Sequence, residues 1–273
     1  MENIILKKFL TYFLILILPL FLCACGKESS KKESSKAEQI PVYEKIISSG
    51  KMRVGIILNS KPMTYSDSNG NPTGFEIDLA REIAKRLIGA NAQVEFIPVT
   101  NNDRIEAVNN GTVDMVIATM TINDYRKISV YFSKPYYLAA QTIMVRGNSD
   151  IKTVSDLNNR KIGTVTGTTS EQSLRHFAPY AVPARQKSFI ENVRDLKAGN
   201  ADALIQDDVL ILGYMKDNPG YRMFSQKLTV EPYGIAFKKS PDSQILMKHV
   251  DMILDDLKDD GTLNKLKTKY NLK

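Results

Sequence analysis

The sequence predicts an α/β fold made of two Rossmann-like lobes that are joined by two hinge strands. Short apolar strands alternate with amphipathic helices from residue 41 onward, and this alternation passes through two successive cycles. The segment is also long enough for two modest lobes rather than one. Ligands of such sheets bind beyond the carboxyl ends of the strands. Functional residues are therefore expected just after the predicted strands.

The first cycle spans residues 43–118. Its clearest helix is 75–87, which has one charged face and one apolar face. The apolar face consists of Ile77, Ala80, Ile83, Ala84 and Leu87. Gly70 and Gly74 bracket a hairpin-like turn before this helix. The other predicted elements are helices at 43–48 and 103–109 and strands at 52–57, 93–98 and 113–118.

The second cycle predicts strands at 161–165 and 201–205. Helices are expected at 154–157, 167–176, 188–198 and 209–214, and two further helices, 242–260 and 262–270, return the chain to the first lobe. Segments 142–145 and 229–237 are the natural crossings between lobes. The sequence thus predicts one lobe from residues 41–143 and 234–273 and the other from residues 144–233.

The N-terminus has the pattern of an export signal. Lys7 and Lys8 precede an apolar run at 9–21, which is shorter than the ~20 residues that span a membrane. The following residues resemble a bacterial lipobox, so residues 1–24 are predicted to be a lipoprotein signal peptide and Cys25 the first mature, lipidated residue. Cys23 departs from the lipobox pattern, where Ala or Ser is commoner. The alternative is an uncleaved anchor with an incidental cysteine pair.

Residues 25–40 predict a flexible tether. Between residues 26 and 39 no apolar residue is larger than Ala37, and serines alternate with charges of both signs. Such a stretch cannot bury enough surface to order itself. A basic binding arm is the alternative, but four lysines against three glutamates leave almost no net charge.

Composition argues against several classes of function. Both cysteines lie in the N-terminal segment, so the fold is expected to contain no disulfide, no thiolate nucleophile and no cysteine-based metal site. His176 and His249 have no metal-ligand spacing, and catalytic and phosphate-binding motifs are missing. The net charge of +7 is spread along the chain, which argues against nucleic acid binding. The sequence predicts a binding protein without cofactor or metal, and not an enzyme.

A carboxylate-binding site is predicted after strand 113–118. Thr119 and Thr121 follow this strand, and Asn123 or Asp124 caps a short helix whose first turn carries Arg126. A planar guanidinium beside free N–H groups at a helix start suits a small carboxylate. The alternative for Arg126 is a surface residue, but a cation opposes the helix dipole at this position, which favours an anionic partner.

Residues 114–137 also resemble the signature segment of the family 3 solute-binding proteins, which deliver amino acids to ABC importers. The family pattern is roughly Asp-x-x-x-(Ala/Gly)-x-x-Thr-Ile-Thr-x-x-Arg, ending in Phe-Ser-x-Pro-Tyr. Segments 74–80, 199–203 and 232–237 are similar to the family as well. The resemblance implies a type II periplasmic-binding-protein fold that closes by a hinge. It also implies a monomeric lipoprotein, held by acyl chains on the extracellular face of the cell membrane in the Gram-positive manner, with an ABC transporter permease as partner.

The resemblance implies ligand contacts from both lobes. Asp207 and the Thr119 carbonyl are expected to accept from the ligand's ammonium. The ligand's carboxylate is expected to meet Arg126, Thr121, Thr168 and Thr169. Asp207 alternatively caps the next helix, and Thr168 and Thr169 can serve as helix caps as well.

Side-chain specificity is predicted from positions where many family members carry aromatics around the ligand. The matching positions here are about Ser60 and Asn101, and neither is aromatic. Segment 100–104 resembles the Asn-x-Arg segment of members that bind glutamate and aspartate, where the arginine meets the second carboxylate. This implies an acidic ligand held by Arg104, with Gln206 also in the site. Lys61 is a further candidate cation.

Three alternatives stay open. Arg104 can instead be a solvated helix residue beside Asp103. The ligand can instead be glutamine or cystine. The same fold also hosts a few dehydratases, but these turn over ring-bearing acids, which the non-aromatic Ser60 and Asn101 disfavour.

Overall fold

The computed structural model describes residues 41–272. The predictions for the signal peptide, the tether and Cys25 lie outside these residues. In the part of the chain that is described, each helix is too short or too polar to cross a membrane.

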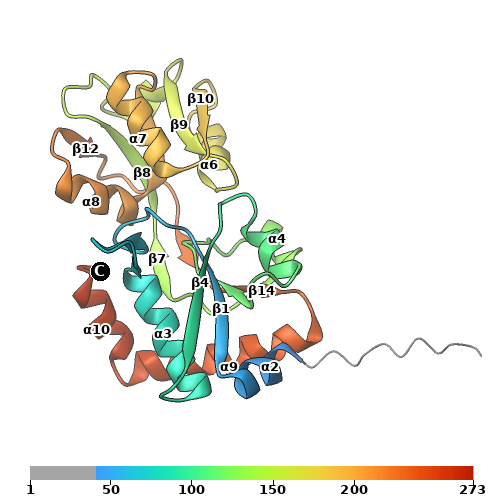
Figure 1. The fold of residues 1–273 in the computed structure, drawn as a ribbon. Coiled ribbons are helices and arrows are strands. Elements are labelled where there is room, and N and C mark those ends of the chain that lie inside the picture. Colours follow the sequence, from blue (N-terminus) through green and yellow to red (C-terminus); the bar gives the residue numbers. More distant parts are fainter. Residues whose placement is uncertain (1–40, 273) are drawn as a thin grey trace, which may run out of the picture. The chain divides into compact units, whose positions relative to one another are not determined.

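Two five-stranded sheets organise the molecule (Figure 1). The first sheet has the order β4-β1-β5-β14-β6. Its strands are β1 (Lys51–Ile56), β4 (Gln93–Pro98), β5 (Met115–Val116), β6 (Val130–Phe132) and β14 (Ala236–Lys238). Strand β1 is parallel to β4 and β5, whereas β14 is antiparallel to β5 and β6.

The second sheet has the order β10-β9-β11-β8-β12. Its strands are β8 (Gln141–Arg146), β9 (Lys161–Val165), β10 (Val182–Gln186), β11 (Ala203–Asp207) and β12 (Tyr221–Met223). Strand β9 is parallel to β10 and β11, and β8 is antiparallel to β11 and β12. Two mixed sheets, each with its own helices, confirm the predicted α/β fold of two lobes.

The helices agree with the apolar periodicity of the sequence to within a few residues. They are α2 (Val42–Ser49), α3 (Phe75–Ile88), α4 (Arg104–Asn109), α5 (Asp124–Lys127), the 3₁₀ turn η2 (Val154–Leu157), α6 (Ser170–Phe177), α7 (Phe189–Ala198), α8 (Asp208–Asp217), α9 (Pro241–Asp259) and α10 (Thr262–Lys269). Serine side chains cap two of them: Ser188 accepts from the Glu191 N–H (3.3 Å) and Ser240 from the Ser243 N–H (3.3 Å). The two strands β2 (Tyr65–Ser66) and β3 (Pro72–Thr73) form a hairpin that turns at residues 67–71, so the turn lies slightly before the predicted one, and Pro72 belongs to β3.

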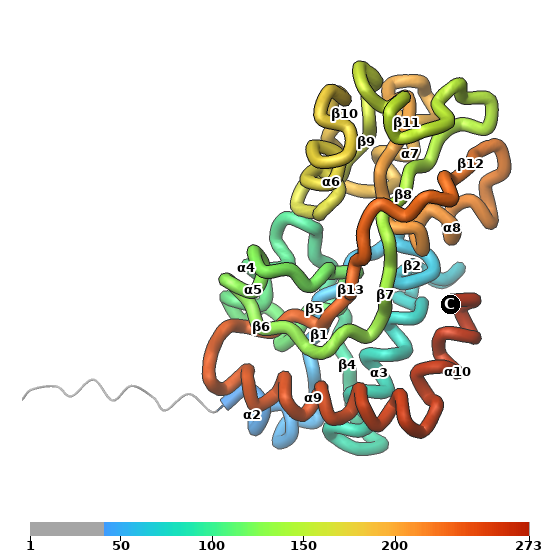
Figure 2. The backbone as a smooth tube through the Cα atoms, turned by 180° about the vertical axis from the view of Figure 1, so that it is seen from behind, coloured from blue at the N-terminus to red at the C-terminus, as the bar shows by residue number. Residues whose placement is uncertain are grey.

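A pair of antiparallel strands, β7 (Tyr137–Ala139) and β13 (Glu231–Tyr233), runs side by side between the two sheets (Figure 2). The second predicted crossing, 229–237, contains β13. The first, 142–145, is wrong, because these residues lie inside β8 and pair with β11 and β12. A buried apolar run fits a sheet strand and a crossing strand equally well, which explains the error. We therefore propose that the first lobe boundary lies before β8.

Aromatic side chains make the core continuous across the hinge strands. The Tyr233 ring lies 6.2 Å from the Tyr136 ring and 5.9 Å from the Tyr137 ring, and Phe75 of α3 packs beside both of the latter. All four belong to one apolar cluster that includes residues of both sheets. Residues at or after the carboxyl ends of parallel strands of both sheets line one pocket.

Candidate functional site

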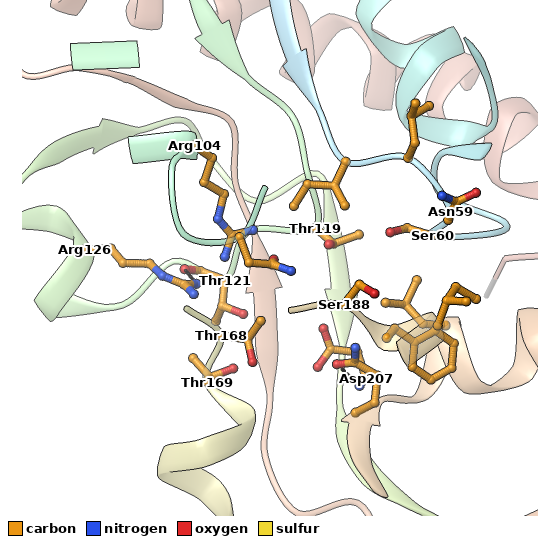
Figure 3. A pocket seen from close by; sticks show the side chains of 17 residues that line it. Asn59, Ser60, Arg104, Thr119, Thr121, Arg126, Thr168, Thr169, Ser188 and Asp207 are labelled. Atoms are coloured by element: carbon orange, nitrogen blue, oxygen red, sulfur yellow. Dashed lines mark hydrogen bonds between the residues drawn. The ribbon is translucent and has the colours of Figure 1, made fainter. Parts of the chain in front are cut away.

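One pocket of the described chain contains all ten residues that the sequence predicts to contact ligand (Figure 3). They follow the strands as expected, after β1, β4 and β5 in the first lobe and after or at the end of β9 and β11 in the second. These residues are Ser60, Asn101, Arg104, Thr119, Thr121, Arg126, Thr168, Thr169, Gln206 and Asp207. The strand ends of both sheets thus bring these side chains together at one pocket.

Arg126 is held at the pocket by the start of α5. The Asn123 side chain caps this helix by accepting from the Arg126 N–H (2.9 Å), which decides between the two predicted caps. The guanidinium is buried, with the residue 6% exposed, so the surface alternative is wrong. Its Nη1 donates to the Thr121 carbonyl (2.8 Å) and its Nη2 to the Gly167 carbonyl (3.0 Å). Burial lowers the pKa of Arg126.

Arg104 is buried as well, at 2% exposed, so the solvated alternative for this residue is also wrong. Its Nη1 donates to the Ala118 carbonyl (2.8 Å) and its Nη2 to the Gly167 carbonyl (3.3 Å). Burial and, second, the charge of Arg126 lower the pKa of Arg104 to about 9. Arg104 therefore remains charged at neutral pH, and each of the two guanidiniums keeps further N–H donors.

Gly167 is the point where the second lobe meets the two arginines. Its φ is +79°, a conformation that favours glycine. A Cβ added here would lie 2.7 Å from the Asn101 carbonyl oxygen and 2.6 Å from the Asn102 Oδ1. The close approach of the lobes over the pocket thus requires glycine at this position.

Asp207 ends strand β11 and occupies the N-cap position of α8, but its side chain makes no capping bond. The alternative of a mere cap is therefore wrong. Its Oδ2 accepts from the Tyr233 hydroxyl, and its Oδ1 is buried without a hydrogen-bond donor. A half-turn of the neighbouring Gln141 amide, whose oxygen is also unpaired, would offer Asp207 a second neutral donor. Burial raises the pKa of Asp207 to about 7, against the lowering effect of these donors.

The charges of the pocket do not neutralise one another. Across residues 41–272, no ion pair includes Arg104, Arg126 or Asp207. Buried charges are costly unless they are paired or well hydrogen-bonded. An arrangement that buries two cations and an anion separately is suited to a ligand that carries both signs of charge.

Thr119 adopts a positive φ of 45° at the end of the β5 segment, which is uncommon for a β-branched residue. Its N–H donates to Glu76 Oε1 (2.7 Å), which also accepts from the Tyr136 hydroxyl (2.5 Å). The Thr64 hydroxyl donates to Glu76 Oε2 (2.9 Å), and burial raises the pKa of Glu76. The burial of this carboxylate was not predicted from the sequence. The sequence feature that could have indicated it is the position of Glu76, an acidic residue between Phe75 and Ile77 on the apolar side of the helix.

Several predicted polar side chains bond to the protein itself. The Thr121 hydroxyl donates to Glu231 (2.6 Å), and the Thr168 hydroxyl donates to the Val165 carbonyl (2.7 Å) at the start of α6. Gln206 Oε1 accepts from the Asp207 N–H (3.0 Å). Lys61 lies outside the pocket lining and pairs with Asp217 (2.5 Å), so its prediction as a cation of the site is wrong.

The second lobe also contributes residues to the site that were not predicted from the sequence. Ser188 and Phe189 at the start of α7 and Leu210 of α8 line the pocket. An aromatic ring is therefore present, although Ser60 and Asn101 are not aromatic. The packing of the helices brings these three residues to the pocket, and no local sequence pattern indicates such packing.

Neither histidine lies in the pocket lining. His249 stacks on Tyr43 with ring centres 4.4 Å apart, and His176 packs against Phe177. Between residues 41 and 272, no group of three or more His, Cys, Asp or Glu side chains is arranged to hold a metal ion.

Residues 52–273 match the family model of the bacterial extracellular solute-binding proteins, family 3. The chain belongs to this family. It is 34% identical over 268 residues to the "ABC transporter glutamine-binding protein GlnH" of Bacillus subtilis (strain 168), covering 97% of each chain. It is 35% identical over 243 residues to the "Glutamine-binding protein" of Geobacillus stearothermophilus, covering 85% of this chain and 93% of that protein.

A solved structure, "An ancestral arginine-binding protein bound to arginine", has a TM-score of 0.75 and 38% sequence identity to this chain. The match covers 81% of this chain and 98% of that one. This similarity agrees with the predicted type II periplasmic-binding-protein fold.

Proposed function

We propose that this chain is the amino-acid-binding component of an ABC importer. One observation carries the proposal: Arg126 and Asp207 line the same pocket, both buried, and neither is part of an ion pair within the described residues. An α-amino acid offers a carboxylate and an ammonium a few ångströms apart. Each would pair with one of these groups when the lobes exclude water.

The two lobes act together in this proposal. The first lobe supplies Arg126 and the segment of Thr119 and Thr121, and the second supplies Asp207 and the turn at Thr168 and Thr169. Closure about the hinge brings them around one ligand, and opening releases it to the permease. The named curated relatives are binding proteins, and ligand recovered after binding is expected to be unchanged. We expect a monomer, which light scattering tests.

For the ligand's side chain we propose a second carboxylate, as in glutamate or aspartate. The support is Arg104, a second buried guanidinium in the same pocket, whose hydrogen bonds go to carbonyls and leave donors free. Glutamine is the second candidate. Two relatives carry it in their names, and the nearby carboxylate of Glu76 raises the pKa of Arg104 against burial, so it offsets part of that charge.

Titration of glutamate, aspartate, glutamine and cystine into the wild type and into Arg104→Ala separates these candidates. We expect the wild type to prefer an acid over its amide by about tenfold or more, because an amide sets donors against donors in a desolvated pocket. Arg104→Ala is expected to lose this preference while it retains weaker binding through Arg126 and Asp207. Lys61→Ala, which removes an exposed cation paired to Asp217, is the matched control. A wild-type preference for glutamine or cystine would reject the acidic ligand.

We also propose that Cys25 is lipidated and holds the protein on the extracellular face of the membrane. The support is the sequence alone: the charged n-region, the short apolar run and the lipobox-like residues. Cys25→Ser is expected to abolish incorporation of labelled palmitate and to release the protein or block its processing, whereas Cys23→Ser is the control that keeps the label. Unchanged labelling and membrane partition of the Cys25 variant would contradict the anchor.

A further inference from the structure

We propose that Glu231 is a positioning residue that joins the ligand-contacting segments of the two lobes in the closed cleft. The proposal rests on the proposed function, because the segments that Glu231 joins are those assigned to the ligand's carboxylate. Glu231 itself does not line the pocket. It lies on the hinge strand β13 and is 3% exposed.

A single oxygen of Glu231 links the lobes. Its Oε2 accepts from the Thr121 hydroxyl (2.6 Å) and from the Thr169 hydroxyl (3.0 Å). Thr121 follows β5 of the first sheet, whereas Thr169 precedes α6 and follows β9 of the second. Because both bonds end on one atom, the two hydroxyl oxygens cannot lie more than about 6 Å apart, twice the ~3.0 Å upper length of an O–H···O bond, without the loss of at least one bond. These bonds therefore report the closed arrangement of the lobes.

The other oxygen is bonded locally. Glu231 Oε1 accepts from the hydroxyl of Thr229 (2.6 Å), two residues away on the same segment. The carboxylate is thus surrounded by three hydroxyl donors, and no ion pair within the described residues includes it. A buried carboxylate needs such donors. Two of the three donors, Thr121 and Thr169, belong to different lobes.

Glu231 also acts on the charged pocket through space. After burial, its charge is the first cause that acts on the pKa of Arg126, and it raises that pKa. The charge of Glu231 therefore favours the charged form of Arg126. The two residues form no ion pair, so Glu231 does not occupy the N–H donors of the guanidinium. Arg126 stays available to a ligand's carboxylate while the desolvation of its charge is partly offset.

Glu231→Gln tests the bridge with little change in volume. The amide has one oxygen and one NH₂ group, so it cannot accept from Thr229 on one side and from both Thr121 and Thr169 on the other. With radiolabelled L-glutamate and L-glutamine as probes, we expect the dissociation rate of the bound probe to rise tenfold or more and the association rate to change less than threefold. Small-angle scattering of the probe-saturated variant is expected to give a larger radius of gyration than that of the wild type.

Thr229→Val is the matched control. It removes a hydroxyl from the same carboxylate, and with it an acceptor of the Gln141 N–H (3.2 Å), but it keeps the bonds of Thr121 and Thr169 to Glu231. Its dissociation rate is expected to stay within about twofold of the wild type. Thr169→Val, alone and combined with Glu231→Gln, completes a double-mutant cycle. If Thr169 acts through Glu231, its replacement accelerates dissociation in the wild type much more than in the Glu231→Gln background.

Each possible result of these experiments either supports or contradicts the bridge through Glu231. Unchanged dissociation in Glu231→Gln, or equal effects of Glu231→Gln and Thr229→Val, would overturn the bridge and leave the proposed function intact. Additive effects of Thr169→Val and Glu231→Gln would show that the two residues act separately and would also overturn it. A wild type that binds neither probe nor any other amino acid would refute the proposed function, and the inference with it.

Discussion

Replacing Arg126 with alanine is expected to weaken amino-acid binding by roughly thirty- to several-thousand-fold, the equivalent of about 2–5 kcal/mol. Arg126 is buried and lies in the first turn of α5, with Nη1 and Nη2 on the carbonyls of Thr121 and Gly167. Its replacement would leave the ligand's carboxylate in a closed, desolvated pocket without its cation. The loss should appear mainly as faster dissociation.

Calorimetric titration of the wild type and the Arg126→Ala variant measures this loss. Arg81→Ala is the control, because it removes a guanidinium on the exposed side of α3, where the side chain is 51% exposed. Its affinity should match the wild type. Near wild-type affinity of Arg126→Ala would remove Arg126 from the site.

Replacing Asp207 with asparagine is expected to lower affinity over a similar range and to flatten its dependence on pH. In the unliganded protein, burial raises the pKa of Asp207 to about 7, and only the ionised carboxylate pairs with an ammonium. Affinity of the wild type should therefore fall by about tenfold per pH unit below 7, or roughly thirtyfold between pH 8 and pH 5.5. The amide of the Asp207→Asn variant does not titrate, so this variant should bind weakly at all these values.

The stability of the unliganded protein should change in the opposite sense. A carboxyl whose folded pKa lies above its unfolded pKa stabilises the fold most when it is protonated. This contribution is present below the ordinary value of 3.8 and is lost as pH rises through about 7. The ligand-induced rise in Tm should therefore grow between pH 5.5 and 8. Asp217→Asn is the control, since Asp217 pairs with Lys61 (2.5 Å) outside the pocket and is not among the charges that act on the pKa of Asp207. Asp207→Asn with the wild-type pH profile would contradict the assignment.

The sequence predicts the site well because its residues follow strand ends. Thr119 and Arg104 come after strands of the first sheet, and Thr168 and Asp207 come after or at the end of strands of the second. The carboxyl ends of neighbouring parallel strands meet at one edge, so local alternation of strands and helices suffices to bring such residues together. The helix boundaries could also be predicted from the sequence, because apolar periodicity and capping are local signals.

Features that are set by tertiary packing could not be predicted from the sequence. The segment 142–145 has the same apolar character whether it crosses between lobes or pairs within a sheet, so the hinge strand β7 was missed. The burial of Arg104 depends on carbonyls far along the chain. Glu76 and Glu231 are buried carboxylates whose donors come from distant segments. Nothing in their immediate sequence shows that those donors exist.

The clamp on the ligand's backbone is tested most directly by titrating the wild type with L-glutamate and with two compounds that each lack one charged group. Glutarate has no ammonium, and 4-aminobutanoate has no α-carboxylate. L-glutamine serves as the reference in the event that the amide is preferred. We predict that L-glutamate or L-glutamine binds at least a hundredfold more tightly than either truncated compound, because each truncation leaves Asp207 or Arg126 buried without its partner. Binding of glutarate or 4-aminobutanoate as tightly as the intact amino acid would contradict the clamp.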